Sequence, residues 1–325
     1  ISLSINFYSD DEDLQNIISS KTGPGKIFIG PLTSDDSKEI NKWCKDNVLF
    51  FSFASDRSLA RDCIYLINFF PEDELEALFN FFGKNKKIAL LFPENDYGIY
   101  ISKIIDEIAN NSNSVLVSKV SYKEDLSNAR VSIKKLSKYE LRKKELKRQK
   151  NILKNKDDEV SKKALKKIEK FETIGELDFS HIIIADYNIR LLQIAPLLPF
   201  YDVDPNRIKF VGTGVWDDEV FFYEPSLQGG IFPGIPKNKR NFFIKDYSAT
   251  YKELPIRTST IIYDLIGLLS YFYENNFQIN EVKNLLNASQ TKFDGIDGKF
   301  VFKNNLIKRE LSILEISNGK TELIK

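Results

Sequence analysis

The stretch Lys87-Ile-Ala-Leu-Leu-Phe-Pro-Glu-Asn-Asp-Tyr-Gly98 decides the fold class of this chain. It begins with an apolar strand, Ile88–Phe92, and continues into a polar turn, Glu94–Asp96. A helical spacing of isoleucines begins at Ile101, soon after this turn. In α/β proteins, ligands bind at the carboxyl ends of strands that lead into helices in this way. Tyr97, which closes the turn, is therefore a candidate ligand contact.

The same alternation of strand and helix covers most of the chain. The expected strands are Ser2–Phe7, Lys26–Gly30, Val48–Phe53, Tyr65–Phe69, Ile88–Phe92, Val115–Tyr122, His181–Ala185, Ile208–Val211, Leu227–Pro233, Gly298–Phe302 and Glu310–Ile316. The expected helices are Asp11–Ser20, Ser37–Asp46, Pro71–Phe82, Ile99–Asn110, Ile189–Leu198, Asn241–Leu254 and Thr258–Glu274. Several strands are apolar throughout, which predicts parallel sheets with helices on both faces.

Residues 128–172 interrupt this alternation. Two apolar stripes at helical spacing run through the segment: Leu136, Tyr139, Leu146, Leu153, and then Val160, Ala164, Ile168, Phe171. Residues 131–174 hold 16 Lys and Arg but 7 Asp and Glu, a net charge of +9, whereas the whole chain carries +1. We predict two antiparallel helices that project into solvent. They are either a solvated surface or a docking arm for an acidic partner.

The composition excludes several function classes. The chain of 325 residues is long enough for two domains, and no apolar run is long enough to cross a bilayer. The near-neutral charge predicts no nucleic-acid partner. The only histidine, His181, cannot build a zinc site or a Ser-His-Asp triad by itself, and no phosphate-binding glycine loop is present. We therefore expect no enzyme, no metal and no cofactor, although paired loop carboxylates such as Asp217-Asp218 leave a hydrolase as a third class.

The two cysteines, Cys44 and Cys63, are too few for a disulfide framework. They could form one disulfide in an oxidising compartment, but we expect two free buried thiols. Ile1 is not an initiator residue, so we expect a processed amino terminus, compatible with an export signal or a lipid anchor.

Five segments carry a resemblance to a known fold. They are Ile29-Gly-Pro-Leu-Thr-Ser34, Leu49-Phe-Phe-Ser-Phe-Ala-Ser55, the strand and Asp-Tyr-Gly of 88–98, the helix 260–268 with its Tyr-Asp pair, and Phe293-Asp-Gly-Ile-Asp-Gly-Lys-Phe-Val-Phe302. In order and spacing they resemble the type I periplasmic-binding fold, the group that includes leucine/isoleucine/valine-binding proteins. The first strand and helix of that fold are expected to precede Ile1.

A narrower resemblance is to the alphaproteobacterial branch of penicillin-binding protein activators. It rests on the basic insertion, on Leu197-Leu-Pro-Phe-Tyr-Asp-Val-Asp-Pro205, and on Gly212-Thr-Gly-Val-Trp-Asp217 followed by Glu224-Pro-Ser-Leu-Gln-Gly229.

The resemblance implies an α/β protein of two lobes, each a parallel sheet flanked by helices. Lobe 1 would comprise 1–86 and 236–303. Lobe 2 would comprise 87–235 and 304–325, with the basic helical hairpin of 128–172 inserted in it. Such proteins close about a hinge on a molecule held between their lobes, and they make or break no bond in it.

The resemblance also implies a ligand site. Turn hydroxyls and strand-end backbone would hold a ligand carboxylate, at Thr33, Ser34, Ala54 and Ser55. Tyr97 would stack on the ligand, and later strand ends offer Tyr187 and Trp216. The family acid that binds the ligand ammonium falls near 213–216, where this chain has no carboxylate, and Asp217 is the nearest one.

Two functions follow from these resemblances. In the first, the chain is a non-enzymatic periplasmic regulator that contacts a cell-wall synthase, as activators of penicillin-binding proteins do. In the alternative, it is the solute-binding receptor of an ABC importer for amino acids or similar small polar ligands, and it contacts the membrane subunits of the importer. The basic hairpin and the missing acid favour the first, and the hydroxyl turns and Tyr97 favour the second.

Overall fold

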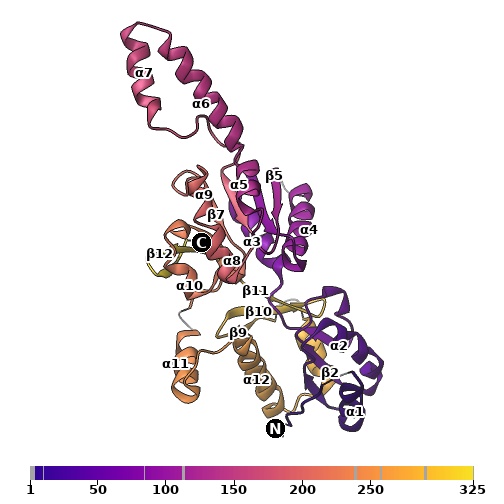
Figure 1. The fold of residues 1–325 in the computed structure, drawn as a ribbon. Coiled ribbons are helices and arrows are strands. Elements are labelled where there is room, and N and C mark those ends of the chain that lie inside the picture. Colours follow the sequence, from indigo (N-terminus) through magenta and orange to yellow (C-terminus); the bar gives the residue numbers. More distant parts are fainter. Residues whose placement is uncertain are drawn as a thin grey trace. The chain divides into compact units, whose positions relative to one another are not determined.

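The computed structural model describes residues 4–9, 11–83, 85–111, 114–237, 240–256, 258–288 and 291–324 (Figure 1). The chain divides into two compact units. Unit 1 comprises Ile1–Phe70 and Ile235–Glu310, and unit 2 comprises Pro71–Gly234 and Leu311–Lys325. Among the described residues, no helix is both long and apolar enough to cross a membrane.

Unit 1 contains a mixed sheet in the strand order β1-β2-β3-β11-β10-β9. Its strands are β1 (Ile27–Ile29), β2 (Leu49–Ser52), β3 (Ile64–Leu66), β9 (Phe293–Gly295), β10 (Gly298–Lys303) and β11 (Leu306–Arg309). The first three strands and β11 are joined by parallel pairing, whereas β9, β10 and β11 form an antiparallel meander. The sequence predicted a wholly parallel sheet, and the short turns between the last three strands allow antiparallel pairing instead.

The described helices of unit 1 cover this sheet. They are α1 (Asp11–Lys21), α2 (Ser34–Glu39), α11 (Arg240–Tyr251), α12 (Ser259–Glu274) and α13 (Ile279–Asn287), with 3-10 helices at Ile40–Asp46 and Arg57–Leu59. All four residues of β2 are buried, as the apolar run predicted. At the centre of the core, the Phe51 ring lies 5.6 Å from that of Tyr65 and 6.2 Å from that of Phe302.

A disulfide joins Cys44 to Cys63, with 5.3 Å between their Cα atoms. Cys44 lies in the 3-10 helix that follows α2, and Cys63 directly precedes β3. The expectation of two free thiols was therefore wrong. The reason is tertiary: the parallel pairing of β2 with β3 returns the chain to the end of this helix, where the two thiols meet.

Removal of this disulfide is expected to destabilise unit 1. The cysteines are 19 residues apart, and a loop of that length restricts the unfolded chain by about 3 kcal/mol. The double variant Cys44→Ala/Cys63→Ala should therefore have a free energy of unfolding about 3 kcal/mol lower, measured in urea. Reductant should lower the stability of the parent protein and leave that of the double variant unchanged. Equal stability of parent and variant would contradict the prediction.

Unit 2 contains a sheet in the order β13-β12-β8-β7-β6-β4-β5. Its strands are β4 (Lys87–Pro93), β5 (Val115–Tyr122), β6 (His181–Ile184), β7 (Lys209–Val211), β8 (Ile231–Gly234), β12 (Ser312–Ser317) and β13 (Lys320–Leu323). The strands from β5 to β8 are parallel, and β12 and β13 extend the sheet in antiparallel pairing.

The helices of unit 2 cover both faces of its sheet. The described ones are α3 (Pro71–Phe82), α4 (Asp96–Asn111), α5 (Ala129–Leu136), α6 (Tyr139–Lys154), α7 (Glu159–Glu169), α8 (Asn188–Ile194), α9 (Leu197–Phe200) and α10 (Glu219–Phe222), with 3-10 helices at Gly214–Trp216 and Pro225–Leu227. Ile182 and Ile184 enter the core beneath α5 and α8, whereas Ile183 and Ala185 enter the core beneath α3 and α4. This alternation explains why every residue from Ile182 to Ala185 is apolar.

Helix α3 packs within unit 2, against α4, β8 and β12. Its buried residues Leu75, Leu78 and Phe82 share a core with β4. The division between the units therefore falls at 70/71, 234/235 and 310/311, whereas the sequence placed it at 86/87, 235/236 and 303/304. A helix between two strands has an apolar face that suits either neighbour, so its amphipathic pattern does not say which sheet it covers.

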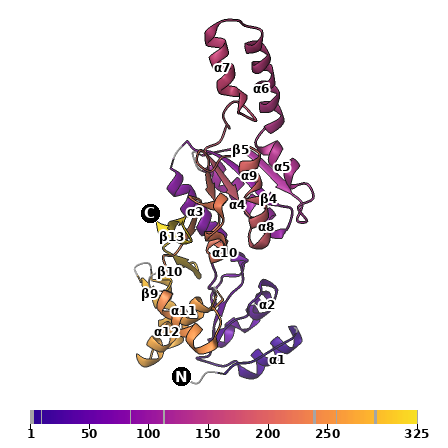
Figure 2. The same ribbon diagram turned by 60° about the vertical axis from the view of Figure 1, so that its left-hand side comes forward.

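The basic insertion forms a helical hairpin, α6 and α7, that extends away from the sheet of unit 2 (Figures 1 and 2). The segment predicted as two helices contains three, because α5 ends at Leu136 and covers the sheet with its own buried residues. The hairpin begins at Tyr139, whose ring packs edge-on against Tyr201 at 5.4 Å. An ion pair of 3.0 Å from Arg142 to Asp202 fixes the same end.

Some predicted elements differ from the structure. Residues 4–7 of the expected strand 2–7 form no strand, and residues 1–3 lie outside the described residues. The single helices expected at 37–46 and 189–198 are each divided in two. The strand expected at 227–233 begins only at Ile231, because a 3-10 helix extends to Leu227. Helix α13 and strands β9, β11 and β13 were not predicted. These are short elements, whose few residues carry little periodic signal.

His181 begins β6 and has a structural environment. Its ring lies 4.8 Å from that of Phe82, and its Nδ1 is 2.8 Å from the Ser180 hydroxyl. Burial, followed by the charges of Lys86 and Lys209, lowers the pKa of His181 to about 4. The folded protein therefore holds this imidazole neutral at pH values where an exposed histidine would be charged.

The stability of unit 2 should consequently fall in mild acid. An unfolded chain protonates this histidine below about pH 6.5, while the folded chain resists protonation until about pH 4. The contribution is complete above pH 6.5 and is lost as the pH falls from 6.5 toward 4. The variant His181→Gln should lose less unfolding free energy between pH 7 and pH 5 than the parent does. Because this is the only histidine, an identical pH dependence in both proteins would contradict the assignment.

Candidate functional site

Two hydroxyls of unit 1 lie together at the carboxyl ends of β1 and β2. The Ser34 Oγ is 3.5 Å from the Ser55 Oγ, and it accepts a hydrogen bond of 3.2 Å from the Asp56 amide. Ser34 begins α2 and Ser55 follows β2, so parallel pairing of neighbouring strands brings the two turns together. Hydroxyls grouped in this way can donate hydrogen bonds to an anionic group such as a carboxylate.

The other two residues predicted for this half of the site have structural roles. Thr33 caps α2, because its Oγ1 accepts a hydrogen bond of 3.1 Å from the Asp36 amide. Ala54 is completely buried, and its amide donates to the Ser52 hydroxyl at 3.0 Å. Thr33 therefore caps a helix and Ala54 is enclosed in the core, whereas Ser34 is partly exposed and Ser55 is exposed.

In unit 2, Tyr97 lies at the centre of an aromatic and polar group at the carboxyl ends of β4, β6 and β7. Its hydroxyl is 2.6 Å from the Thr213 Oγ1, and its ring meets the Tyr187 ring edge-on at 5.1 Å. The three residues come from separate parts of the sequence and follow three adjacent strands. Burial raises the pKa of the Tyr97 hydroxyl, so it acts as a neutral hydrogen-bonding group and not as an acid.

A glycine fixes the position of Tyr97. The Gly98 amide donates to the Asn95 side chain at 2.9 Å, and this bond closes the turn after β4. A Cβ at Gly98 would lie 2.2 Å from the Pro93 carbonyl oxygen, which is too close for any larger residue. Helix α4 therefore begins directly against the end of the strand, with Tyr97 in its first turn.

A buried carboxylate that the sequence analysis missed supports this group. Asp186 is completely buried and accepts hydrogen bonds from the Tyr122 hydroxyl and from Arg190, whose Nε lies 3.2 Å from both carboxylate oxygens. Arg190 also donates to Glu124 at 3.1 Å and lies 5.3 Å from the Tyr187 ring. Burial, and then the Asp186 charge, raises the pKa of Tyr122. The signal available in the sequence was the acid directly after a buried strand, four residues before an arginine.

A second missed carboxylate comes from α3. The Glu74 Oε2 accepts a hydrogen bond of 2.9 Å from the Gly214 amide, at the turn that follows β7. A Cβ at Gly214 would lie 2.2 Å from the Glu74 carboxylate, so the glycine allows this approach. The structure therefore places an acid beside residues 213–216, where the sequence itself has none. No local pattern in the sequence could have indicated a partner 140 residues away.

Trp216 and Asp217 lie in this turn but differ from the prediction. Trp216 is completely buried, and its ring fills the space that a Cβ on Gly212 would need. The ring belongs to the core of unit 2 and is not a surface that a ligand can reach in this structure. Asp217 ends the 3-10 helix Gly214–Trp216 and is partly buried. Of the eight predicted residues, Ser34 with Ser55 and Tyr97 with Tyr187 form two accessible pairs.

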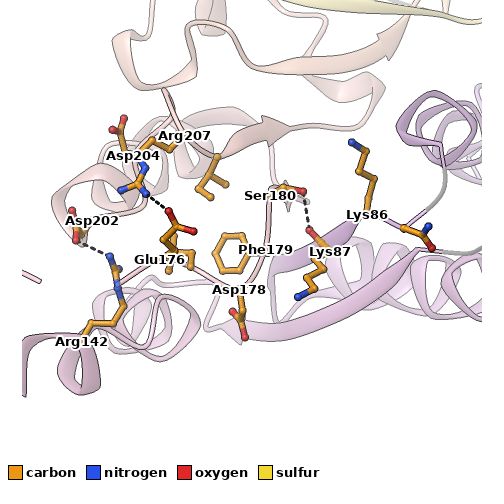
Figure 3. Close-up of a pocket in the computed structure, with 13 residues that line it drawn as sticks. Lys86, Lys87, Arg142, Glu176, Asp178, Phe179, Ser180, Asp202, Asp204 and Arg207 are labelled. Carbon is orange, nitrogen blue, oxygen red and sulfur yellow. Dashed lines mark hydrogen bonds and ion pairs between the residues drawn. The ribbon is translucent and has the colours of Figure 1, made fainter. Parts of the chain in front are cut away.

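A cavity of about 600 Å³ lies at the amino ends of the unit 2 strands, at the foot of the hairpin (Figure 3). Its charged lining residues are Lys86, Lys87, Arg142, Arg207, Glu176, Asp178, Asp202 and Asp204. The Arg142–Asp202 pair of 3.0 Å and the Arg207–Glu176 pair of 3.3 Å lie across it. Equal numbers of opposite charges give the cavity no preference for an anion or a cation, and the Arg142–Asp202 pair holds the base of α6.

Unit 1 offers a pair of hydroxyls, and unit 2 offers aromatic rings and carboxylates. Among the described residues, no cluster of His, Cys, Asp or Glu is placed to hold a metal ion. The unit 1 pair suits an anionic group, and the unit 2 group, with Glu74 beside Tyr97, suits a cationic group because carboxylates and aromatic faces both attract positive charge. This chemistry suits reversible binding of a small polar molecule.

Comparisons with known proteins agree with this fold. No protein-family profile and no curated protein sequence matches the chain. Solved structures do match. The branched-chain amino acid transporter substrate-binding protein LivJ from Streptococcus pneumoniae, in complex with isoleucine, is 18% identical, and the match covers 97% of this chain and 83% of that chain with a TM-score of 0.59.

Two structures from Rhodopseudomonas palustris match in the same way. An extracellular ligand-binding receptor is 14% identical over 96% of this chain and 85% of that chain, with a TM-score of 0.61. An ABC transporter solute-binding protein in complex with benzoate is 12% identical over 97% of this chain and 80% of that chain, with a TM-score of 0.60. The predicted fold class, that of two-lobed periplasmic binding proteins, is confirmed. Identities this low establish the fold and leave the ligand open.

The hydrogen bond between Tyr97 and Thr213 should make a measurable contribution to stability. The variants Tyr97→Phe and Thr213→Val should each lower the unfolding free energy by about 1 to 3 kcal/mol, because each leaves the remaining hydroxyl without its hydrogen-bond partner. A double-mutant cycle measured by urea unfolding should give a coupling energy of about 1 kcal/mol. A cycle of Tyr97→Phe with Lys103→Ala, an exposed change in α4, should be additive. If the first cycle were additive, the Tyr97–Thr213 hydrogen bond would make no measurable contribution to stability, and the prediction would be contradicted.

Proposed function

We propose that this protein is a non-enzymatic solute receptor that works outside the cytoplasm and binds a small polar ligand. The observation that carries the proposal is the group around Tyr97, which gathers an aromatic pair and a carboxylate at the carboxyl ends of parallel strands. The neighbouring structures include proteins described as binding isoleucine and benzoate, and proteins of this fold include ABC transporter receptors. The Cys44–Cys63 disulfide supports an oxidising compartment such as the periplasm.

We further propose that the ligand carries an amino group. Glu74, together with the ring of Tyr97, would attract the ammonium form of that group. This assignment gives Glu74 the part that the family gives to an acid near residues 213–216. A ligand with an ammonium group, such as an amino acid, fits these groups better than a purely acidic solute.

Thermal melting against a panel of amino acids and aromatic acids tests the proposal. A ligand at a hundred times its dissociation constant should stabilise the protein by about 2.7 kcal/mol, seen as a rise in melting temperature. The variant Tyr97→Ala should abolish that rise. Tyr100→Ala is the matched control, because Tyr100 lies one turn further along α4 and is exposed.

Substitution of the acid separates the two ligand classes. Glu74→Gln should abolish the rise in melting temperature with amino acids, since it removes the charge that attracts the ammonium. An undiminished response of Glu74→Gln to amino acids would reject the ammonium assignment. A response to aromatic acids alone would favour a receptor for carboxylates, and no response to any compound would count against the receptor.

The alternative, a regulator of a cell-wall synthase, is favoured by one observation, the strongly basic hairpin of α6 and α7. The second argument for the regulator was that the sequence has no carboxylate at residues 213–216. Glu74 supplies a carboxylate beside these residues, so this argument no longer favours the regulator. Capture of a penicillin-binding synthase by the purified protein, lost when exposed hairpin lysines are neutralised, would support the regulator. The importer subunits, a cell-wall synthase and a lipid anchor all stay predictions.

A further inference from the structure

We propose that the hairpin of α6 and α7, residues 139–170, binds the surface of an anionic phospholipid bilayer. These 32 positions hold 13 Lys and Arg and 6 Asp and Glu, a net charge of +7. The hairpin extends away from the sheet of unit 2 in both views, so its helices meet solvent on most sides (Figures 1 and 2).

The carboxylates of the hairpin neutralise few of its lysines. Glu145 pairs with Arg148 at 2.7 Å, and Glu140 pairs with Lys134, which lies outside the hairpin, at 2.9 Å. The Asp158 side chain caps α7 by accepting from the Ser161 amide at 2.8 Å. Seven exposed lysines have no ion-pair partner among the described residues: Lys144, Lys147, Lys154, Lys156, Lys163, Lys166 and Lys167.

The spacing of these lysines makes one helix face almost wholly cationic. In α7, Lys163, Lys166 and Lys170 are three and four residues apart and exposed, while the partly buried Leu165 and Ile168 lie on the side that packs against α6. In α6, Lys147 and Lys154 lie on one face with Lys150, which donates to the Glu169 and Phe171 carbonyls at the end of α7. Lys150 therefore ties α6 to the end of α7, while Lys147, Lys154, Lys163 and Lys166 remain exposed.

The type of cation favours a membrane over a protein partner. Both arginines of the hairpin are engaged within the chain, Arg142 with Asp202 and Arg148 with Glu145, so every partner-free cation is a lysine. A lysine ammonium is a point charge that responds to a diffuse field, whereas the arginine fork recognises single carboxylates by geometry. A lipid surface that contains anionic headgroups is such a diffuse field.

Exposed aliphatic side chains lie among these lysines. Leu141 is 68% exposed, Ile152 43% and Val160 77%. Ile152 and Val160 flank the turn between the helices, next to Lys154 and Lys156. Apolar side chains at the tip of a basic helical element can enter the boundary between headgroups and acyl chains. The combination of lysine-rich helix faces with exposed aliphatic side chains is the chemistry that recognises an anionic bilayer, although the turn itself also carries Asp157, Asp158 and Glu159.

The test is flotation of the whole protein with phosphatidylcholine vesicles that contain or lack phosphatidylglycerol. The protein should float with the acidic vesicles only, and high salt should release it because screening shortens electrostatic attraction. The variant with Lys147, Lys154, Lys163, Lys166 and Lys167 all changed to Gln should partition at least ~100-fold more weakly, since each lysine near an anionic surface contributes about five-fold. Glutamine retains helix propensity, and unchanged circular dichroism would confirm an intact fold.

A matched variant controls for net charge. Lys26, Lys103, Lys123, Lys299 and Lys303 are exposed lysines elsewhere, and their change to Gln removes the same charge. This control should float with acidic vesicles nearly as well as the parent does. Equal loss in both variants, or no flotation of the parent, would overturn the proposal. Hairpin-dependent binding of poly-glutamate without flotation would also overturn it and would identify an acidic protein as the partner.

Discussion

A parallel sheet that is covered on both faces can present polar chemistry only where its strands end, and unit 2 depends on this constraint. Ile182, Ile183 and Ile184 point in alternation into two cores, so none of the positions of β6 after His181 is left for a polar side chain. Polar side chains that could contact a ligand therefore lie among the residues that follow each strand. Because neighbouring strands are parallel, the turns after β4, β6 and β7 open at the same edge, and Tyr97, Tyr187 and Thr213 meet there.

Buried charge gives this edge its rigidity. Asp186 would be costly to bury alone, and Arg190 and the Tyr122 hydroxyl compensate its charge. Arg190 in turn lies against the ring of Tyr187, so the ion pair also orients an aromatic side chain of the candidate site. At the amino ends of the same strands, another ion pair has a different role: Arg142 and Asp202 fix the foot of a projecting hairpin. The candidate ligand site and the hairpin thus lie at opposite ends of the same parallel strands.

The two proposals concern separate parts of unit 2 and rest on different physics. Ligand binding depends on a few groups held in fixed positions, where a hydrogen bond of 2.6 Å between Tyr97 and Thr213 limits movement. Attraction of the hairpin to a membrane depends on many charges and on no single contact. A receptor with both properties would remain near a membrane while it exchanged its ligand, which suits a partner of membrane transport subunits.

The sequence by itself determined the features that depend on near neighbours. Apolar runs predicted the buried strands, Gly98 and its turn predicted the start of α4 beside Tyr97, and the stripe with its excess of lysine predicted the hairpin. Tertiary structure alone decided the pairing of Cys44 with Cys63, the burial of Trp216, the packing of α3 within unit 2 and the approach of Glu74 to Gly214. Periodicity and capping depend on residues a few positions apart, so both can be recognised from the sequence alone. The Glu74–Gly214 hydrogen bond spans 140 residues and exists only because the sheet places one helix beside the end of another strand.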